Sequence, residues 1–188
     1  MRLFFGIKLS EEVSSSVIRA IEKQDFGRVP FRWVPPENFH FTLKFLGETD
    51  ESKLPAIREA AGKVASAIKN EFSLSLSEFG AFPTLSSPRV IFYSVEQGGE
   101  ILASLAADLD NEISALGFRK EKRAYHPHLT LARIKKRPDP GITEKLKKVP
   151  PLRTGNTQKV DSFQLIRSFL SRSGARYQKL DDFDFSGG

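Results

Sequence analysis

Apolar and polar residues alternate in short runs along much of the chain, and in other segments they recur at helical spacing. The runs Arg2 to Lys8 and Phe39 to Leu46 show the alternation that is typical of half-buried strands. From Glu51 to Lys69 the spacing instead predicts an amphipathic helix. The same patterns predict strands at 2–8, 39–46, 71–81, 89–96, 126–134, 157–169 and 176–184, a short extended piece at 31–34, helices at 11–24, 51–69 and 100–116, and a loop over 138–151 with room for one short helix.

The order of these elements predicts an α+β fold with largely antiparallel sheets, because hairpin-like strand pairs alternate with helices. The order also repeats within the chain. A helix precedes each of the strands 39–46 and 126–134, and a pair of strands follows each of them. We therefore predict a single domain, residues 1–188, made of two similar lobes related by pseudo-twofold symmetry, one carrying His40 and the other His128.

The tetrapeptide pattern His-x-Thr-Leu occurs twice, at residues 40–43 and 128–131, and uses two of the three histidines in the chain. Shuffled sequences of this composition would contain two copies in roughly a few chains per 100,000. Each copy lies in a predicted strand. Chance is therefore a poor explanation, and the two strands are the strongest candidates for a functional site.

Strand alternation places His40, Thr42 and Lys44 on one face of the first motif strand. In the second motif strand His128 and Thr130 share a face in the same way. Each lobe thus offers an imidazole and a hydroxyl on the polar face of a strand that is anchored through its apolar face. Two such pairs facing each other would form an acid–base site.

The composition limits the kinds of chemistry that are available. The 188 residues are 39% hydrophobic and include no Cys, so a sizeable core is possible while disulfides, thiolate nucleophiles and Cys-ligated zinc are excluded. No apolar run could span a bilayer, and the first residues resemble a strand rather than a signal peptide, so we expect a cytoplasmic protein without a membrane partner. Glycine motifs of P-loop and dinucleotide-binding proteins are missing.

The net charge of +6 favours a polyanionic partner such as nucleic acid, because Lys and Arg release counterions from phosphates. Basic residues bracket the second motif, within 119–123 and within 133–137. A solvated loop face explains either run equally well. The charge therefore indicates a class of partner without singling out the contact residues.

The stretch FRWVPPENFHFTLKFLGE at 31–48, together with HLTLAR at 128–133, resembles the two-histidine phosphoesterase superfamily. Within it the chain is most similar to the RNA 2′,3′-cyclic phosphodiesterase family, also called the 2′-5′ RNA ligase family. The likeness extends to residues 80–83 and 88–92. It implies two antiparallel sheets around a V-shaped cleft with helices outside, and hydrolysis of a terminal 2′,3′-cyclic phosphate to a 2′-phosphate without metal or another cofactor.

Such chemistry needs a base to activate water and an acid to protonate the departing ribose oxygen, and two imidazoles can do both near neutral pH. Thr42 and Thr130 would donate hydrogen bonds to the nonbridging phosphate oxygens. Following the family, we assign His40 as the proton donor to the ribose 3′ oxygen and His128 as the proton acceptor from water. By microscopic reversibility, a site that cleaves 2′-5′ bonds would also ligate them.

Other residues are candidates for substrate binding. Arg133 matches a basic residue that follows the second motif in the family, but strict alternation turns it away from His128 unless the strand bulges. Lys44 could attract phosphate or lie in solvent further along the cleft. Phe82 is a core residue or a platform for a base. His126 fits a packing role better than catalysis, because Pro127 holds it extended.

Two alternative functions fit the sequence less well. A zinc enzyme is disfavoured because each motif has Thr rather than a carboxylate beside its His, and a His-Glu-x-x-His motif is missing. A noncatalytic module that binds RNA ends is disfavoured because Arg and Lys would serve phosphate binding better than His. The expected partner is RNA with a 2′,3′-cyclic phosphate end. Transfer RNA halves, other processed RNA ends and small cyclic nucleotides all present this terminal chemistry. We expect a monomer, because two lobes complete the site within one chain.

Overall fold

The computed structural model describes every residue of the chain except 25, 27–30, 136–137, 172–173 and 187–188. Most helices and strands lie where the sequence pattern predicts them. The helices are α1 (Glu11–Glu22), α2 (Leu54–Ala67), α3 (Gly99–Ala115) and α4 (Pro140–Lys147), with one-turn helices η1 (Pro36–Asn38) and η2 (Glu51–Lys53). The strands are β1 (Arg2–Lys8), β2 (Phe31–Trp33), β3 (His40–Glu48), β4 (Phe72–Phe82), β5 (Val90–Val95), β6 (His128–Ile134), β7 (Thr157–Val160), β8 (Ser162–Leu170) and β9 (Ala175–Asp184).

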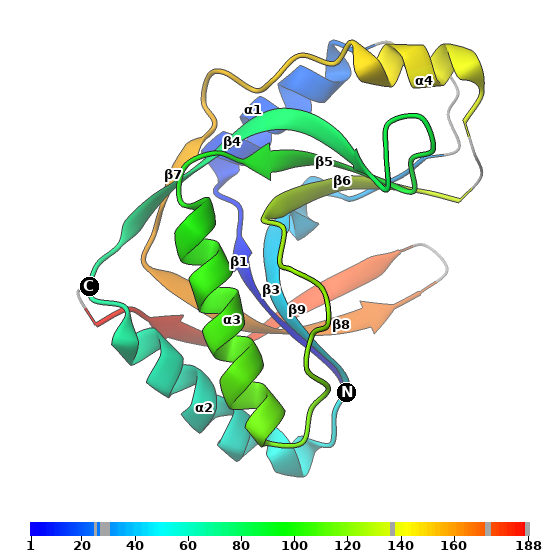
Figure 1. Cartoon of the computed structure of the whole chain (residues 1–188). Coiled ribbons are helices and arrows are strands. Elements are labelled where there is room, and N and C mark those ends of the chain that lie inside the picture. The colour runs from blue at the N-terminus through cyan, green and yellow to red at the C-terminus, as the bar shows by residue number, and fades with distance from the viewer. Residues whose placement is uncertain (25, 27–30, 136–137, 172–173, 187–188) are drawn as a thin grey trace.

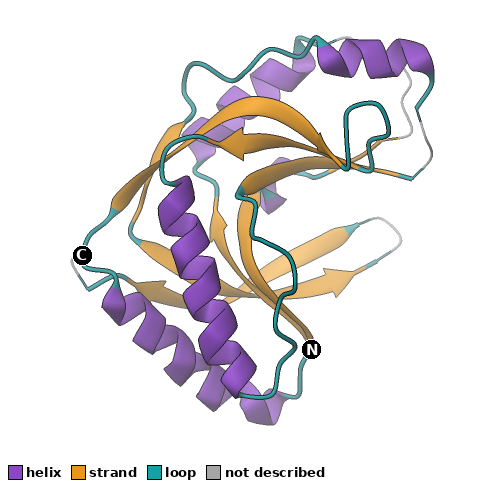
Figure 2. Cartoon of the chain, in the orientation of Figure 1, coloured by secondary structure: helices purple, strands orange, loops and turns teal. Residues whose placement is uncertain are grey.

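These strands form two antiparallel sheets with the orders β3-β1-β8-β9 and β2-β6-β5-β4-β7. The chain passes from one sheet to the other where β7 leads into β8, and the sheets open away from this junction as a V (Figure 1). Helices α2 and α3 pack against each other and against the four-stranded sheet, while α1 and α4 lie over the outside of the five-stranded sheet (Figure 2). The predicted α+β fold with two antiparallel sheets is confirmed.

Local signals in the sequence explain where the helices begin and end. The Ser10 hydroxyl accepts a hydrogen bond from the Val13 amide at 3.2 Å, and Asp139 Oδ1 accepts one from the Ile142 amide at 2.9 Å. Both are N-caps that satisfy an amide in the first helical turn. Gly117 follows the end of α3 with a φ of +86°, a conformation that favours glycine.

One predicted strand, 157–169, is wrong. The chain forms two strands there, because Asp161 separates β7, which pairs with β4, from β8, which pairs with β1 and β9. Apolar residues continue on both sides of the junction, so the hydrophobic pattern does not reveal the change of sheet. The second motif strand also starts later than predicted, at His128, because Pro127 has no N–H to donate to a neighbouring strand.

The two sheets do not coincide with the two halves of the sequence. The hairpin β4–β5 from the first half lies beside β6, the motif strand of the second half. The hairpin β8–β9 from the second half lies beside β1, which pairs with the first motif strand β3. Each motif strand therefore belongs to a sheet that both halves of the chain complete.

Candidate active site

Both motif strands are fixed in the core through one face, and they lie against each other where the two sheets meet. The apolar residues that alternate with the motif His and Thr are buried in each strand. The His and Thr side chains are half-buried on the opposite faces. The buried anchors are Phe41 and Leu43 in β3, and Leu129 and Leu131 in β6.

The two motif histidines are held in the same way. His40 Nδ1 lies 2.6 Å from the backbone oxygen of Asn38, and His128 Nδ1 lies 2.6 Å from the backbone oxygen of His126. A carbonyl oxygen can only accept a hydrogen bond, so Nδ1 carries the proton in both rings. Nε2 of each neutral imidazole is therefore the atom that can take up or deliver a proton.

A β-bulge follows the motif threonine in each strand. Thr42 pairs with Gly6 but Lys44 pairs with Phe5, so Leu43 is an extra residue in β3. In β6 Leu131 is the extra residue, because Thr130 pairs with Phe92 while Ala132 pairs with Ile91. An extra residue reverses the alternation of every side chain that follows it.

Because of the reversed alternation, Lys44 does not lie on the face that the sequence predicts. Its side chain is 1% exposed, and its ammonium donates hydrogen bonds to Asp110 Oδ1 at 2.5 Å and to the Arg119 backbone oxygen at 2.7 Å. The bulge turns Lys44 into the interior and turns Phe45, which is 50% exposed, outward. The prediction that Lys44 binds substrate is therefore wrong.

The bulge in β6 affects Arg133 in the opposite way, because it turns this residue toward the site rather than into the interior. The bulge at Leu131 brings Arg133 to the face that carries His128 and Thr130, and its side chain is exposed there. Its positive charge lowers the pKa of His40 and Tyr177 in the four-stranded sheet and of His128 in the five-stranded sheet. Substrate binding by Arg133 stays a prediction, but the geometric objection to it is removed.

Burial is the main reason why the pKa values of both histidines lie below the ordinary value of 6.5. The hydrogen bond from Nδ1 to a backbone carbonyl works in the opposite direction in each ring. The charge of Arg133 lowers the pKa of both further, and a positive charge on His128 lowers that of His40. A negatively charged ligand between the two rings would offset these effects and raise both pKa values.

The two motif threonines differ in their contacts. Thr42 Oγ1 lies 3.0 Å from His40 Nε2, and the Thr42 backbone oxygen accepts a hydrogen bond from the Tyr125 hydroxyl at 2.9 Å. Burial raises the pKa of Tyr125, so this hydroxyl remains a donor over the working range of pH. Tyr125 comes from the segment that leads into His128, and it therefore links the two motif strands directly. Sequence reasoning did not find it.

Aromatic rings surround His128 on the five-stranded sheet. Phe82 and Phe92 stack with ring centroids 4.3 Å apart, and both meet the His128 ring, at 5.1 Å and 5.4 Å. Gly80 makes room for this pair, because a Cβ there would lie 2.7 Å from Phe92 Cζ. Of these rings only Phe82 was predicted. His126 is exposed, and its ring centroid lies 6.3 Å from that of Phe82.

His40 has aromatic neighbours of its own, from the four-stranded sheet. The Phe4 ring lies 4.9 Å and the Tyr177 ring 5.1 Å from the His40 ring, and Tyr177 meets it edge-on. Burial raises the pKa of Tyr177, while the charges of Arg133 and Arg2 lower it. Neither ring was a sequence candidate, because Phe4 and Tyr177 lie in ordinary alternating strands far from the motif in sequence.

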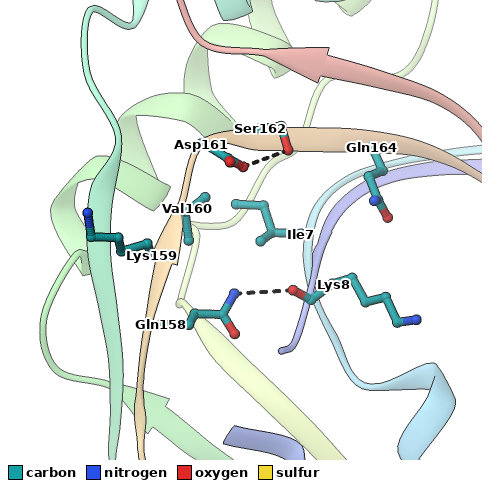
Figure 3. Close-up of a pocket in the computed structure, with 8 residues that line it drawn as sticks. All are labelled: Ile7, Lys8, Gln158, Lys159, Val160, Asp161, Ser162 and Gln164. Atoms are coloured by element: carbon teal, nitrogen blue, oxygen red, sulfur yellow. Dashed lines mark hydrogen bonds between the residues drawn. The ribbon is translucent and has the colours of Figure 1, made fainter. Parts of the chain in front are cut away.

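A polar pocket lies at the junction of the two sheets, apart from the histidines (Figure 3). Gln158 spans it by donating a hydrogen bond to the Lys8 backbone oxygen at 3.2 Å and accepting one from the Ser10 amide at 2.7 Å. None of the predicted site residues lines this pocket. These bonds connect β7 to the end of β1, and the pocket is part of the joint between the sheets.

In the described part of the chain, three or more His, Cys, Asp or Glu side chains do not come together anywhere as a group that could hold a metal ion. Among the same residues, no helix has the length and apolar character needed to cross a membrane.

Known proteins share this arrangement. A family model described as LigT-like phosphoesterase matches residues 7–92 and 94–177. The chain belongs to this family. An RNA 2′,3′-cyclic phosphodiesterase of Thermotoga maritima is 36% identical over 100% of this chain and 97% of its own. A protein with the same name from Archaeoglobus fulgidus is 34% identical over 98% of this chain and 100% of its own.

Solved structures of LigT-like proteins also have this fold. Escherichia coli LigT in complex with 3′-AMP superposes with a TM-score of 0.82 at 30% identity and covers 98% of both chains. A Thermus thermophilus protein gives a TM-score of 0.79 at 33% identity, over 100% of this chain and 99% of its own. The two-histidine phosphoesterase family predicted from the motifs is thereby confirmed.

Proposed function

We propose that the protein hydrolyses terminal 2′,3′-cyclic phosphates of RNA to 2′-phosphates by general acid–base catalysis from His40 and His128. The observation that carries the proposal is the matched anchoring of the two rings, each through Nδ1 at 2.6 Å to a backbone oxygen, which leaves two Nε2 atoms for proton transfer. The names of the relatives, RNA 2′,3′-cyclic phosphodiesterase, support the choice of substrate.

In the proposed reaction His128 Nε2 takes a proton from water as the water oxygen forms a bond to phosphorus. The bond from phosphorus to the ribose 3′ oxygen breaks, and protonated His40 delivers its proton to that oxygen. The products are a 2′-phosphate and a 3′-hydroxyl. His128 then returns its proton to solvent and His40 regains one, so that the site is reset. With an RNA 5′-hydroxyl in place of water, the same steps would form a 2′-5′ bond: the 5′ oxygen bonds to phosphorus, its proton goes to His128, and the ribose 3′ oxygen leaves with the proton from His40.

The neighbouring residues have supporting roles in this proposal. Thr42 and Thr130 donate hydrogen bonds to the nonbridging phosphate oxygens, where negative charge grows in the transition state. Arg133 pairs with the same phosphate and favours its negative charge. The stacked rings of Phe82 and Phe92 form an apolar wall beside His128 that suits the face of a nucleobase. We further infer that one chain, with its two lobes, is a complete catalytic unit.

The test uses a short RNA that ends in a 2′,3′-cyclic phosphate, incubated with the purified protein in the presence of EDTA. Mass spectrometry and phosphatase sensitivity identify the product. We expect a 2′-phosphate product, and losses of about 10²- to 10⁴-fold in kcat for His40→Ala and for His128→Ala. The matched control is His126→Ala, which removes an exposed imidazole but keeps the backbone oxygen that holds His128. It should retain wild-type turnover.

The alternative function is a module that binds RNA ends without catalysis. The excess of basic side chains supports RNA binding in either case. Tight binding of the cyclic end without turnover by the wild-type protein would favour this module and reject the proposed enzyme. Turnover that survives in both histidine variants would reject the two-histidine mechanism.

A further inference from the structure

Two arginines lie side by side next to the proposed site. Arg32 in β2 is the direct cross-strand partner of Arg133 in β6. Directly opposite residues of antiparallel strands point to the same face, with Cβ atoms about 4.5–5.5 Å apart. Arg32 therefore shares the face of Arg133 and His128, and both arginine side chains are exposed. Because β2 is an edge strand, Arg32 lies at the open border of the five-stranded sheet.

A third arginine approaches from the other sheet. Arg2 lies two residues before Phe4 in β1 and so shares its face, and the Phe4 ring contacts His40 and Tyr177 at 4.9 Å and 5.1 Å. The bulges between β1 and β3 insert residues into β3 only, so the alternation of β1 is regular. The charges of Arg2 and Arg133 both act on Tyr177, one from each sheet.

We propose that Arg2, Arg32 and Arg133 form a clamp for the phosphodiester backbone of the RNA that leads to the reacting end, so that the protein prefers oligonucleotide ends to cyclic mononucleotides. The inference rests on the proposed function and adds to it the length of the substrate. Arg32 lies one strand further from the motif threonines than Arg133, as expected for a contact with the next phosphate. Guanidinium groups also match phosphate oxygens through two parallel hydrogen bonds.

The first test compares a cyclic mononucleotide with an RNA pentamer that ends in the same nucleotide and cyclic phosphate. We expect the ratio of kcat/KM for pentamer to that for mononucleotide to fall about ten-fold or more in Arg2→Ala and in Arg32→Ala, because each loses a charge-assisted contact. Arg32→Lys should give an intermediate ratio. The matched control is Lys63→Ala, which removes one positive charge from the exposed surface of α2 and should keep the wild-type ratio.

Turnover of the mononucleotide shows that a variant is folded. A ratio that stays at the wild-type value in both arginine variants would overturn the clamp. A second measurement follows binding of the 2′-phosphate pentamer by fluorescence anisotropy at increasing salt. Each arginine that is removed should flatten the plot of log K against log salt by roughly 0.7. This measurement tests the clamp even if the wild-type protein turns over neither substrate, an outcome that would reject the proposed enzyme alone.

Discussion

Lys44 and Asp110 form a buried ion pair, with Lys44 Nζ 2.5 Å from Asp110 Oδ1, which joins the first motif strand to helix α3. Burial works to raise the pKa of Asp110, but hydrogen bonds from Lys44 and from the Glu121 amide outweigh it and hold the pKa below its usual value. Glu121 and Arg119, whose backbone oxygen accepts from Lys44, belong to the segment that leads to His128. The pair therefore helps to fix one motif strand relative to the other.

Removing one partner of this pair should be costly. Asp110→Ala leaves the Lys44 ammonium buried without its carboxylate, and we expect a loss of about 3–5 kcal/mol in the free energy of unfolding. Urea denaturation followed by circular dichroism measures it. Replacing both partners, as in Lys44→Met with Asp110→Leu, removes both charges and should cost much less. A loss that is equal in the single and the double variants would contradict this account.

The pH dependence of kcat/KM should be bell-shaped, because the proposed mechanism needs one histidine protonated and the other neutral. Burial lowers both pKa values of the free protein, so the maximum should lie below pH 6.5. Bound phosphate raises both, and the profile of kcat should therefore lie at higher pH than that of kcat/KM. Steady-state rates between pH 4 and pH 9 provide the measurement. An alkaline limb of kcat/KM with an apparent pKa above 6.5 would show that burial does not control these groups.

Arg133→Ala should move the pH profile as well as reduce the rate. The Arg133 charge lowers the pKa of both His40 and His128, so its loss raises both and shifts the profile of kcat/KM to higher pH. Lys63→Ala, remote on α2, is the control for a change of net charge. A lower rate with no shift of the profile would mean that Arg133 acts on the substrate alone.

The motif threonines should matter unequally. Thr130→Val removes a hydroxyl that we propose to donate to the phosphate, and we expect kcat to fall by about 10²-fold. Thr42→Val should cost more, because the Thr42 hydroxyl also lies 3.0 Å from His40 Nε2. Single-turnover rates with saturating protein separate this effect from binding. Wild-type rates in both variants would remove the threonines from the mechanism.

Adding one methyl group at Gly80, beside Phe92, should weaken substrate binding. A Cβ at Gly80 would lie 2.7 Å from Phe92 Cζ, so Gly80→Ala must displace the ring that stacks on Phe82 beside His128. We expect KM to rise about ten-fold if the rings hold a base. Gly62→Ala is the control, because a Cβ there meets nothing within 4 Å. It should leave KM unchanged and raise the free energy of unfolding by about 0.5–1 kcal/mol, since Gly is a poor helix residue.

Sequence reasoning located the elements and the family because these depend on local patterns. Alternation, helical spacing and the duplicated His-x-Thr-Leu pattern are all visible within short windows. The family assignment followed from the flanks of the same motif. The predicted helix at 100–116 ends close to the observed end of α3, and Gly117 follows it with a positive φ. The matched anchoring of His40 and His128 agrees with this duplication.

What the sequence missed depends on contacts between distant strands. The bulges at Leu43 and Leu131 are defined by the partner strands β1 and β5, so alternation alone assigned Lys44 to the wrong face. Tyr177 and Tyr125 lie near the site because of the order of strands in the sheet and the path of the loop before β6. The break at Asp161 was missed because it, too, depends on which strands pair. Substitutions of Tyr177 and Tyr125 would be the ones to examine when activity is lost without a change in the motifs.

The exchange of hairpins between the two halves has a consequence for how this chain acquires its shape. The strand that carries His40 pairs with β1, but β1 gains its other neighbour only from β8, more than a hundred residues later in the sequence. Pairings of such long range form late, because a large loop must close before they contribute. We therefore expect a chain cut before β8 to expose one side of β1, and both histidines to come into register only when the last hairpin docks.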